Sequence, residues 1–329
     1  MIRRPPRSTP SNSSAASDVY KRQAISRADQ KVSQEDIERV LDEAKAVNLP
    51  LNKEVLEIYP RQYIIDGEGG IKDPLGLRGI KLEVEALATC VFSPYLKNLV
   101  DAVLGAGLEI IDIIPSPLAS AQAVLTPQQK ELGVVLVDIG AGNTGIAVFE
   151  EGSLMHLAIF PVGASHISND IAIALKTEID IAEEIKKKFG NLIFKNTNRK
   201  EKIKLESGEM FVFSTKDFTK AAKARIAEIF DLVKKELKKI SKSGNLPAGV
   251  VLTGGGAKIP NIVDYVKNDL SLPTRVSVPK NFIGPDIDET FSTVCGLALI
   301  GLQEAEEEKS IFDSKPVKKL KKFFKIFIP

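Results

Sequence analysis

The feature that most constrains the fold is an aliphatic run that ends in an acidic residue and a cluster of glycines. In the segment VVLVDIGAGNTGIAV, residues 134–137 are all aliphatic, Asp138 follows them, and Gly140 and Gly142 come directly behind. A continuous aliphatic run of this kind is typical of a strand buried on both faces. Glycines after it predict a tight turn, because they adopt backbone conformations that other residues avoid. The segment therefore predicts a buried strand, a glycine hairpin and a second strand within an α/β fold.

A second strand-and-glycine unit, AGVVLTGGGAKIPN, lies in the C-terminal half of the chain. Gly254, Gly255 and Gly256 follow its apolar run and precede an amphipathic segment, which predicts strand, turn and helix. Closely spaced backbone N–H groups bind phosphate well, and glycines let the ligand approach because no Cβ is in the way. Each turn alone is also consistent with an ordinary tight turn, since short glycine motifs are weak signals. The pair favours a nucleotide site.

The residues around the two turns suggest which part of a nucleotide each turn would bind. Asp138 at the strand tip can hold Mg²⁺ through water, because carboxylates are ligands that this ion prefers. Asn143 and Thr144 add side-chain donors on the phosphate side, while the three glycines of the second turn leave room for sugar and base. We expect both turns to lie close enough together to hold one nucleotide.

Composition excludes several other classes of protein. Lys+Arg 45 against Asp+Glu 43 gives a formal net charge of +2, so the chain is not a nucleic-acid-binding polycation. The two cysteines, Cys90 and Cys295, and only 2 histidines exclude a disulfide scaffold and a zinc cluster. The sequence contains no apolar run of about 18 residues, the length that a transmembrane helix needs.

The rest of the chain divides into predicted elements by its periodicity. Ser33 is the expected N-cap of a helix, with Asp36 three residues on. VLEIYPRQYIIDG and IKLEVEALATCVF predict strands, LEIIDIIPSP predicts a buried strand, and residues 191–213 predict a hairpin or long loop. Further helices are predicted at residues 93–107, 116–125, 166–175, 180–189, 216–240 and 291–302. For residues 131–301 we expect a five-stranded mixed sheet with helices on both faces.

The first 23 residues, MIRRPPRSTPSNSSAASDVYKRQ, differ from the rest of the chain. They are rich in Ser, Pro and Arg and have no apolar period, which predicts a disordered tail. They lack the apolar centre of a secretory signal, whereas their Arg and Ser content leaves a transit peptide open. They also resemble translated sequencing-adapter read-through. We favour this last interpretation, in which the segment is not native to the protein.

The paired turns resemble those of the actin-like ATPase superfamily, with DIGAGNTGIAVF as its second phosphate hairpin and TGGGAKIPN as its adenosine turn. Longer strings resemble the bacterial cell-division family FtsA, from about Glu54 to the C-terminus. They are EIYPRQYIIDGEGGIKDPLGLRGIKLEVEALATC, IIPSPLASAQAVL and ELGVVLVDIGAGNTGIAVFEEGSLMHLAIFPVGASHISNDIAIAL. The resemblance implies an α/β, actin-like (ribonuclease H-like) fold of two lobes with an inserted small α+β subdomain near residues 51–108.

The resemblance also implies a function. FtsA-like proteins bind ATP with Mg²⁺, polymerise like actin, and tether the C-terminal tail of FtsZ to the cytoplasmic face of the cell membrane at the division site, where they recruit other division proteins. They show at most weak ATPase activity. Arg225 matches the family's helix arginine near the base. The implied ATP ligands are Asp138, Gly140, Ala141, Gly142, Asn143, Thr144, Arg225, Gly254, Gly255, Gly256 and Lys258, and no catalytic residue is assigned.

Two departures from the family pattern stand out. Ala141 and Asn143 replace a glycine and a threonine of the usual Asp-Ile-Gly-Gly-Gly-Thr hairpin. In addition, the family's first phosphate hairpin has no counterpart before Ser33, so the chain looks truncated and supplies half of the phosphate clamp. We therefore expect ATP affinity several powers of ten below that of a longer relative, because each charge-assisted hydrogen bond lost costs about 1.5–3 kcal/mol.

The C-terminal segment KPVKKLKKFFKIFIP is strongly basic and amphipathic. On a helix its lysines and its apolar residues fall on opposite faces, apart from Ile326, as in helices that lie in a lipid interface. Its lysines could instead belong to a solvated tail. Such a helix would bind an anionic membrane surface through Lys318, Lys319, Leu320, Lys321, Lys322, Phe323, Phe324, Lys325, Phe327 and Ile328. Nucleic acid is a poorer partner, since it would not need three phenylalanines.

These observations give a domain plan and an alternative function. The plan is a tail to residue 23, an incomplete first lobe at 24–130, a second lobe at 131–303 with a smaller subdomain at 180–246, a linker at 304–314 and a membrane helix at 315–329. The alternative is a PilM-like ATP-binding scaffold of type IV pilus assembly, which would not be expected to end in a basic amphipathic helix. A chaperone is disfavoured, because too few residues follow Gly301 for a peptide-binding domain.

Overall fold

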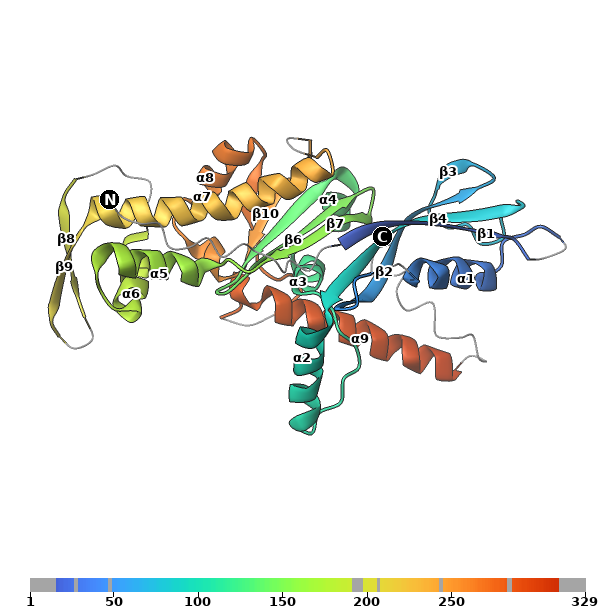
Figure 1. The fold of residues 1–329 in the computed structure, drawn as a ribbon, viewed down its shortest axis with the longest axis horizontal. Helices are drawn as coiled ribbons and strands as arrows, with labels where there is room; N and C mark the ends of the chain where they lie inside the picture. Colours follow the sequence, from blue (N-terminus) through green and yellow to red (C-terminus); the bar gives the residue numbers. More distant parts are fainter. Residues whose placement is uncertain are drawn as a thin grey trace.

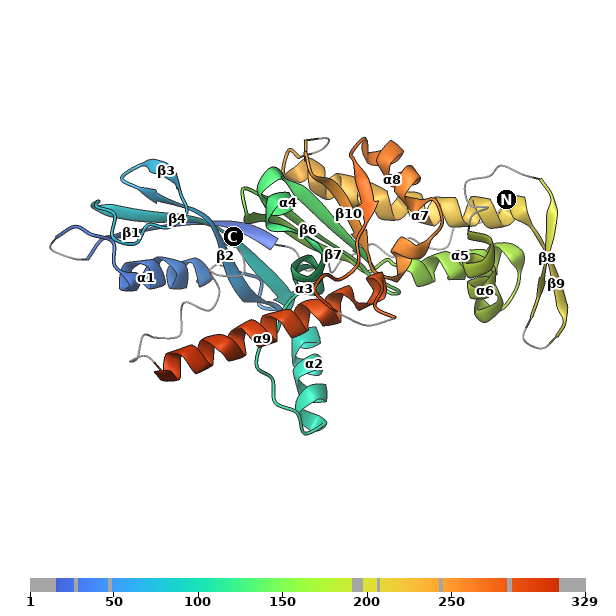
Figure 2. The ribbon, with the colours of Figure 1, turned by 180° about the vertical axis from the view of Figure 1, so that it is seen from behind.

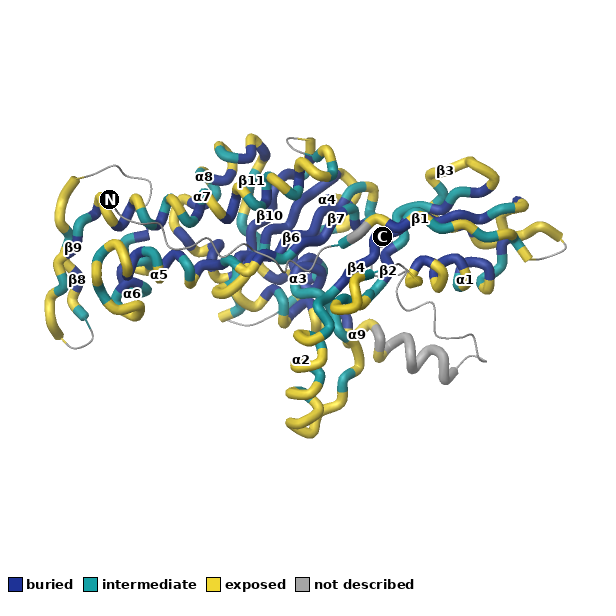
Figure 3. Tube along the Cα trace, viewed as in Figure 1, coloured by how far each residue is buried: buried dark blue, intermediate teal, exposed yellow. Residues whose placement is uncertain are grey.

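The computed structural model describes residues 16–26, 29–46, 49–190, 198–205, 208–242, 245–282 and 286–313. The described chain is elongated, with a four-stranded sheet at one end, a five-stranded sheet in the middle and a two-stranded hairpin at the other end (Figures 1 and 2). No helix among the described residues is long and apolar enough to cross a membrane. Buried residues lie in the central sheet, in the N-terminal sheet and in the helix faces that cover them (Figure 3).

The N-terminal unit is a sheet of order β1-β4-β2-β3 covered by one helix. Its elements are β1 (Ala16–Ala24), α1 (Gln34–Lys45), β2 (Lys53–Ile65), β3 (Glu68–Ile71) and β4 (Lys81–Phe92). The predicted capping box is present, since Asp36 N donates to Ser33 Oγ over 3.3 Å and Ser33 N donates to Asp36 Oδ2 over 2.9 Å. Val40 and Ala44 of α1 pack with Leu82 and Val84 of β4 in one buried core.

The boundaries expected for this unit need correction. Residues 16–23, expected to belong to a disordered or non-native tail, form most of β1, which pairs with β4 from Ala16↔Thr89 to Ala24↔Lys81. The mostly polar edge strand ASDVYKRQA carries little hydrophobic pattern, so its pairing partner, distant in sequence, decides its structure. The sheet therefore starts at Ala16, and not near residue 51, and it takes up residues that we assigned to the first lobe.

The central sheet has the order β11-β10-β5-β6-β7, and the prediction of a five-stranded mixed sheet is confirmed. Its strands are β5 (Val134–Ile139), β6 (Thr144–Glu150), β7 (Ser153–Phe160), β10 (Gly249–Thr253) and β11 (Thr274–Val276). β10 pairs in parallel with β5 and β11, whereas β5, β6 and β7 form antiparallel pairs. Side chains of β5 alternate between two cores: Val134 and Leu136 face one side, and Val135 and Val137 face the other.

Helices cover both faces of this sheet. α3 (Ser116–Val124), α4 (Pro127–Leu132) and α9 (Ser292–Asp313) belong to one side, and α5 (Ala164–Leu175), α6 (Ile179–Phe189), α7 (Thr215–Lys239) and α8 (Ile262–Leu270) to the other. The expected hairpin is confirmed as β8 (Lys200–Lys204) and β9 (Met210–Ser214), which sits at the end of α7. Ile203 and Phe213 of the hairpin share the core of the central sheet.

Two other predictions are wrong. Residues 108–115, expected as a buried strand, form no strand, and Leu108 and Ile111 are exposed. An apolar run becomes a strand only where another strand pairs with it, and in the described chain none does. The acidic segment 304–313, expected as a linker, continues α9 to Asp313, since Glu, Ala and Lys are strong helix formers. α2 (Ser93–Gly105) forms as predicted and has no buried residue.

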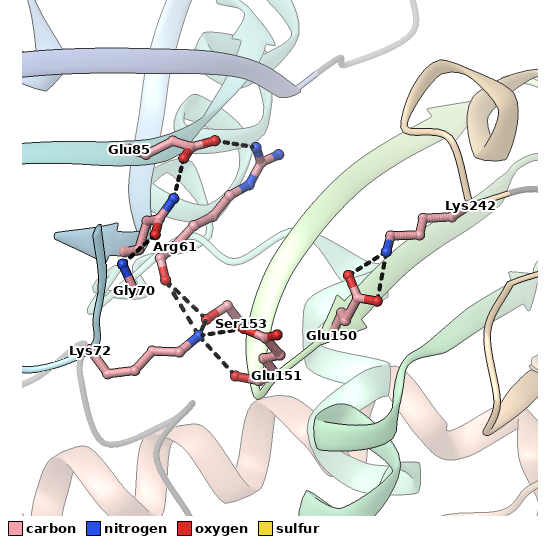
Figure 4. A network of polar contacts seen from close by, with 9 residues as sticks. Arg61, Gly70, Lys72, Glu85, Glu150, Glu151, Ser153 and Lys242 are labelled. Atoms are coloured by element: carbon pink, nitrogen blue, oxygen red, sulfur yellow. Dashed lines mark hydrogen bonds and ion pairs between the residues drawn. The ribbon is translucent and has the colours of Figure 1, made fainter. Parts of the chain in front are cut away.

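The N-terminal unit is fixed to the central sheet by polar contacts (Figure 4). Lys72 Nζ donates to Ser153 Oγ over 2.8 Å and to Glu151 O over 3.0 Å, at the turn between β6 and β7. Arg61 pairs with Asp18 of β1 over 2.7 Å and also donates to the carbonyl of Met155 in β7. These contacts set the edge strand β7 beside β2 and leave the opposite end of the sheet, where the glycine turns lie, uncovered by the N-terminal unit.

Candidate functional site

The first glycine turn joins β5 to β6 as predicted. Gly140 N donates to Asn143 O over 2.9 Å and closes the hairpin. The next three residues, Ala141, Gly142 and Asn143, are exposed, and no acceptor in the described part of the chain takes their N–H groups. A Cβ added at Gly142 would meet no atom within 4 Å. The hairpin thus presents free donors beside open space, which is what an anion requires.

The N-terminus of α5 holds the carbonyl side of the same hairpin. Ala164 N donates to Gly140 O, and Ser165 N donates to Ala141 O, both over 2.9 Å. A Cβ at Gly163 would lie 2.5 Å from Ala141 O, so glycine is needed for this approach. With the carbonyls of Gly140 and Ala141 occupied and the N–H groups of residues 141–143 free, the hairpin has a net positive edge.

Asp138 is the penultimate residue of β5 and lies between the two turns. Its Oδ2 accepts from Ser120 Oγ of α3 over 2.7 Å and from Thr293 Oγ1 of α9 over 3.3 Å. Burial raises the pKa of this carboxyl, and the two hydroxyl donors act in the opposite direction. The described residues hold no group of three or more His, Cys, Asp or Glu side chains that could bind a metal directly. The donor set at this position therefore fits a hydrated cation beside one carboxylate better than an ion in a protein cage.

The second turn packs against the end of β5, directly before the first turn. Thr253 and Asp138 are neighbours in the parallel pair of β10 and β5. Gly254 has φ +80° and its N–H donates to Glu289 O over 3.0 Å, while a Cβ on it would lie 2.4 Å from Asp138 Oδ1. A Cβ on Gly256, in the short 3₁₀ turn η2 (Gly255–Lys258), would lie 2.2 Å from Ile139 Cγ2. The expected closeness of the two turns is confirmed.

Three predicted ligands have partners elsewhere in the fold. The hydroxyl of Thr144 is fully buried and donates to Val162 O over 2.8 Å. Arg225 forms a fork with Asp170, over 2.7 Å and 3.0 Å, that joins α7 to α5 and raises the pKa of the guanidinium. Lys258 binds Asp288, which raises the pKa of the amine. The same contact lowers the pKa of the Asp288 carboxyl to about 2.

The structure also adds residues that the sequence did not indicate. Ser120 and Thr293 reach Asp138 from two helices, and Ser292 contacts Thr253 of β10. Isolated hydroxyls on helices carry no motif, so only the fold brings them to the strand tips. The predicted membrane residues, from Lys318 to Ile328, lie outside the described residues.

Similar proteins are consistent with this geometry. The structure of MreB5 of Spiroplasma citri bound to ADP matches with TM-score 0.52 at 21% identity, over 66% of this chain and 67% of that one. The PilM–PilN type IV pilus biogenesis complex matches with TM-score 0.57 at 18% identity, over 88% and 77%. At these identities the likeness shows the fold alone. With its central sheet and paired glycine turns, the chain has the actin-like ATPase fold.

The sequence comparisons identify the family. A family model described as "Cell division protein FtsA" matches residues 135–296, and one described as "SHS2 domain inserted in FTSA" matches residues 16–89, the sheet of the N-terminal unit. Cell division protein FtsA of Pseudomonas aeruginosa is 39% identical over 290 residues, which are 86% of this chain and 69% of the relative. The chain belongs to the FtsA family of cell division proteins.

Proposed function

We propose that the two glycine turns form the binding site for Mg·ATP. The observation that carries this proposal is the position of the Asp138 carboxylate, which lies between a hairpin with free N–H groups and a turn whose glycines are required by close packing. The free amides of residues 141–143 would bind phosphate oxygens, and Asp138 would hold the hydrated Mg²⁺. When bound, the magnesium ion neutralises phosphate charge.

The other predicted ligands take different parts in this proposal. The open backbone at Gly255, where the nearest atom to an added Cβ is Thr290 Cγ2 at 3.6 Å, would lie against the sugar and base. Lys258 is half exposed at the same turn and would neutralise charge near the ligand. Arg225 and Thr144 would support the site through Asp170 and Val162, because their polar atoms already have these partners.

We further propose the cellular role of a membrane tether. In this role the chain polymerises, binds the FtsZ tail and attaches it to the cytoplasmic face of the cell membrane at the division site, where other division proteins are recruited. Membership of the FtsA family supports the division role. The separated basic and apolar faces of residues 315–329 support attachment, because lysines bind anionic headgroups while phenylalanines enter the acyl boundary. The PilM-like alternative has support from the fold alone.

Calorimetric titration with Mg·ADP and Mg·ATP tests the nucleotide site. The variant Gly142→Ala places a methyl group in the open space of the hairpin without straining the backbone, and we expect it to lower affinity at least tenfold. Its matched control is Gly301→Ala, which also meets no atom within 4 Å but lies on α9. Equal affinities for the parent chain and Gly142→Ala would exclude the hairpin as the phosphate site.

Co-sedimentation with liposomes tests the membrane role. Deleting residues 315–329 should abolish binding to anionic vesicles, and Phe323→Glu with Phe327→Glu should do nearly the same. The control is Leu104→Glu with Leu108→Glu, which adds the same charge at exposed apolar positions elsewhere. Binding of the parent chain should weaken with salt, because lysine attraction is screened. Undiminished binding of the Phe323 and Phe327 double variant would remove the anchor.

Titration with a fluorescent FtsZ tail peptide tests the partner. The full chain should show saturable anisotropy, and a scrambled peptide of the same composition should not. Electron microscopy on lipid monolayers with ATP tests polymerisation, and filaments should be lost when residues 315–329 are deleted, because the chains are then no longer concentrated at the surface. No saturation at any peptide concentration would exclude the tether role while leaving nucleotide binding intact.

A further inference from the structure

The Asp138 carboxylate is held by two helices that lie far apart in the sequence. Ser120 Oγ of α3 donates to Asp138 Oδ2 over 2.7 Å, and Thr293 Oγ1 of α9 donates to the same oxygen over 3.3 Å. The two hydroxyls are 2.9 Å from each other. Ser120 is fully buried, so water does not compete for this oxygen from its side. One carboxylate oxygen is therefore fully engaged by protein donors.

The other oxygen faces the second glycine turn. An added Cβ on Gly254 would lie 2.4 Å from Asp138 Oδ1, so the absence of a side chain there makes room for this oxygen. The two oxygens thus have different surroundings: Oδ2 has two hydroxyl donors, and Oδ1 lies beside bare backbone at the edge of the predicted site. A carboxylate that binds a hydrated cation needs one oxygen directed outward, and fixing its partner achieves this.

The first turn of α9 also holds the neighbouring strand. Ser292, one residue before Thr293, contacts Thr253 Oγ1 at the tip of β10, and its Oγ donates to Glu289 O over 3.0 Å. Glu289 O in turn accepts from Gly254 N. The start of α9 therefore contacts the tips of β5 and β10 together.

The position of these hydroxyls depends on how closely α3 and α9 cross. A Cβ on Gly296 of α9 would lie 1.8 Å from Ala119 O, next to Ser120. A glycine at this crossing lets the helix backbones touch, and the hydroxyls on either side of it then converge on one oxygen. The close crossing of α3 and α9 therefore sets the direction of the Asp138 carboxylate.

We propose that Ser120 and Thr293 are positioning residues that fix Asp138 for a hydrated divalent cation carried by a nucleoside di- or triphosphate. The inference rests on the proposed nucleotide site and extends it to residues outside both glycine turns. Without these donors the carboxylate rotates freely or turns inward, and the cation loses its ligand while the phosphate-binding amides stay in place. The hydroxyls therefore govern the metal-dependent part of nucleotide affinity.

The first test compares ADP affinity with Mg²⁺ and with a chelator, measured by calorimetry. Ser120→Ala and Thr293→Val should each lower Mg·ADP affinity at least fivefold and leave metal-free ADP affinity unchanged. Thr293→Ser keeps the hydroxyl and should restore most of the loss. Thr274→Val is the control, because it removes a hydroxyl that donates to Leu272 O at the edge strand β11, outside the site. Equal losses with and without Mg²⁺ would show a merely structural role and overturn the proposal.

The second test needs no nucleotide. Crystal structures of the full chain and of the Ser120→Ala with Thr293→Val double variant should differ in the orientation of the Asp138 carboxylate. An unchanged carboxylate in the double variant overturns the positioning role, whatever the chain binds. Failure of the parent chain to bind nucleotide would instead defeat the proposed function, so the two failures are distinguished. Circular dichroism melting of each variant checks that the fold persists, and Thr293→Ser supplies a folded comparison if the double variant is unstable.

Discussion

The two glycine turns look alike in the sequence and differ in the structure. In the β5–β6 hairpin, Gly142 lies in open space and the neighbouring N–H groups are free. In the turn after β10, Gly254 and Gly256 would each bring a Cβ within 2.4 Å of β5 atoms. In the first turn glycine leaves open space, whereas in the second it lets two strand tips touch. Glycine content alone therefore does not say whether a glycine leaves open space or permits close packing.

The largest effect expected from this contrast is at Gly254. Gly254→Ala combines φ +80° with a Cβ 2.4 Å from Asp138 Oδ1 and 2.7 Å from Ile139 O, so strain and overlap add. We expect a loss of more than about 3 kcal/mol in the free energy of unfolding, or no folded protein. Urea denaturation measures it. The free energy of unfolding of Gly142→Ala, in the other turn, should stay within about 1 kcal/mol of the parent value. Similar losses for both variants would contradict the structural difference between the two turns.

The contact between the hairpin and α5 gives the next effect. Gly163→Ala places a Cβ 2.5 Å from Ala141 O and 2.6 Å from Gly140 O, at a backbone conformation that alanine can adopt. We expect a loss of about 1–3 kcal/mol, the usual cost of overpacking. Hydrogen exchange at the amides of Ala164 and Ser165 should also quicken, since they donate to these carbonyls. Gly105→Ala, on exposed α2, should not lower stability, since a compatible Gly→Ala change raises it by about 0.4–1 kcal/mol, and should leave this exchange unchanged.

The buried Lys130 lies shortly before β5, the strand that leads to the first turn. The strand that leads to the second turn, β10, begins instead with a glycine. Burial lowers the pKa of Lys130 to about 8. Above that pH the folded chain releases a proton that the unfolded chain keeps to pH about 10.4, so stability rises with pH through this window. Lys130→Met should therefore be more stable than the parent by about 1–2 kcal/mol at pH 7, with the gain disappearing by pH 10. Thermal melts at both pH values measure this, and a gain that persists at pH 10 would argue for packing instead.

The smallest effect is expected at Arg225, which resembles a base contact in sequence and is an ion pair in the structure. Arg225→Gln breaks the partly exposed fork with Asp170, which should cost about 1 kcal/mol. It should change Mg·ADP affinity less than threefold, because the guanidinium reaches α5 and not the turns. Calorimetry on the variant measures the affinity. A tenfold loss of Mg·ADP affinity would instead indicate that Arg225 contacts the nucleotide directly.

The sequence by itself determined the local elements around the site. The aliphatic run of β5, the glycines after it and the second unit at β10 predicted buried strands and turns, because hydrophobic pattern and glycine conformation are local properties. The hairpin β8–β9 and the helices α2, α3, α5, α6 and α7 followed from period and turn residues in the same way, whereas the short helix α4 was not predicted. The neighbouring position of the two turns also followed, once both strands were taken as central in one sheet.

Only the tertiary structure decided which polar groups stay free. Thr144 and Arg225 were expected to bind a ligand, but their partners, Val162 and Asp170, come from elements that folding brings beside them. Residues 16–23 became a strand and residues 108–115 did not, because strand pairing depends on a neighbour distant in sequence. The convergence of Ser120 and Thr293 on Asp138 joins positions with no shared motif, and the close crossing of α3 and α9 produces it.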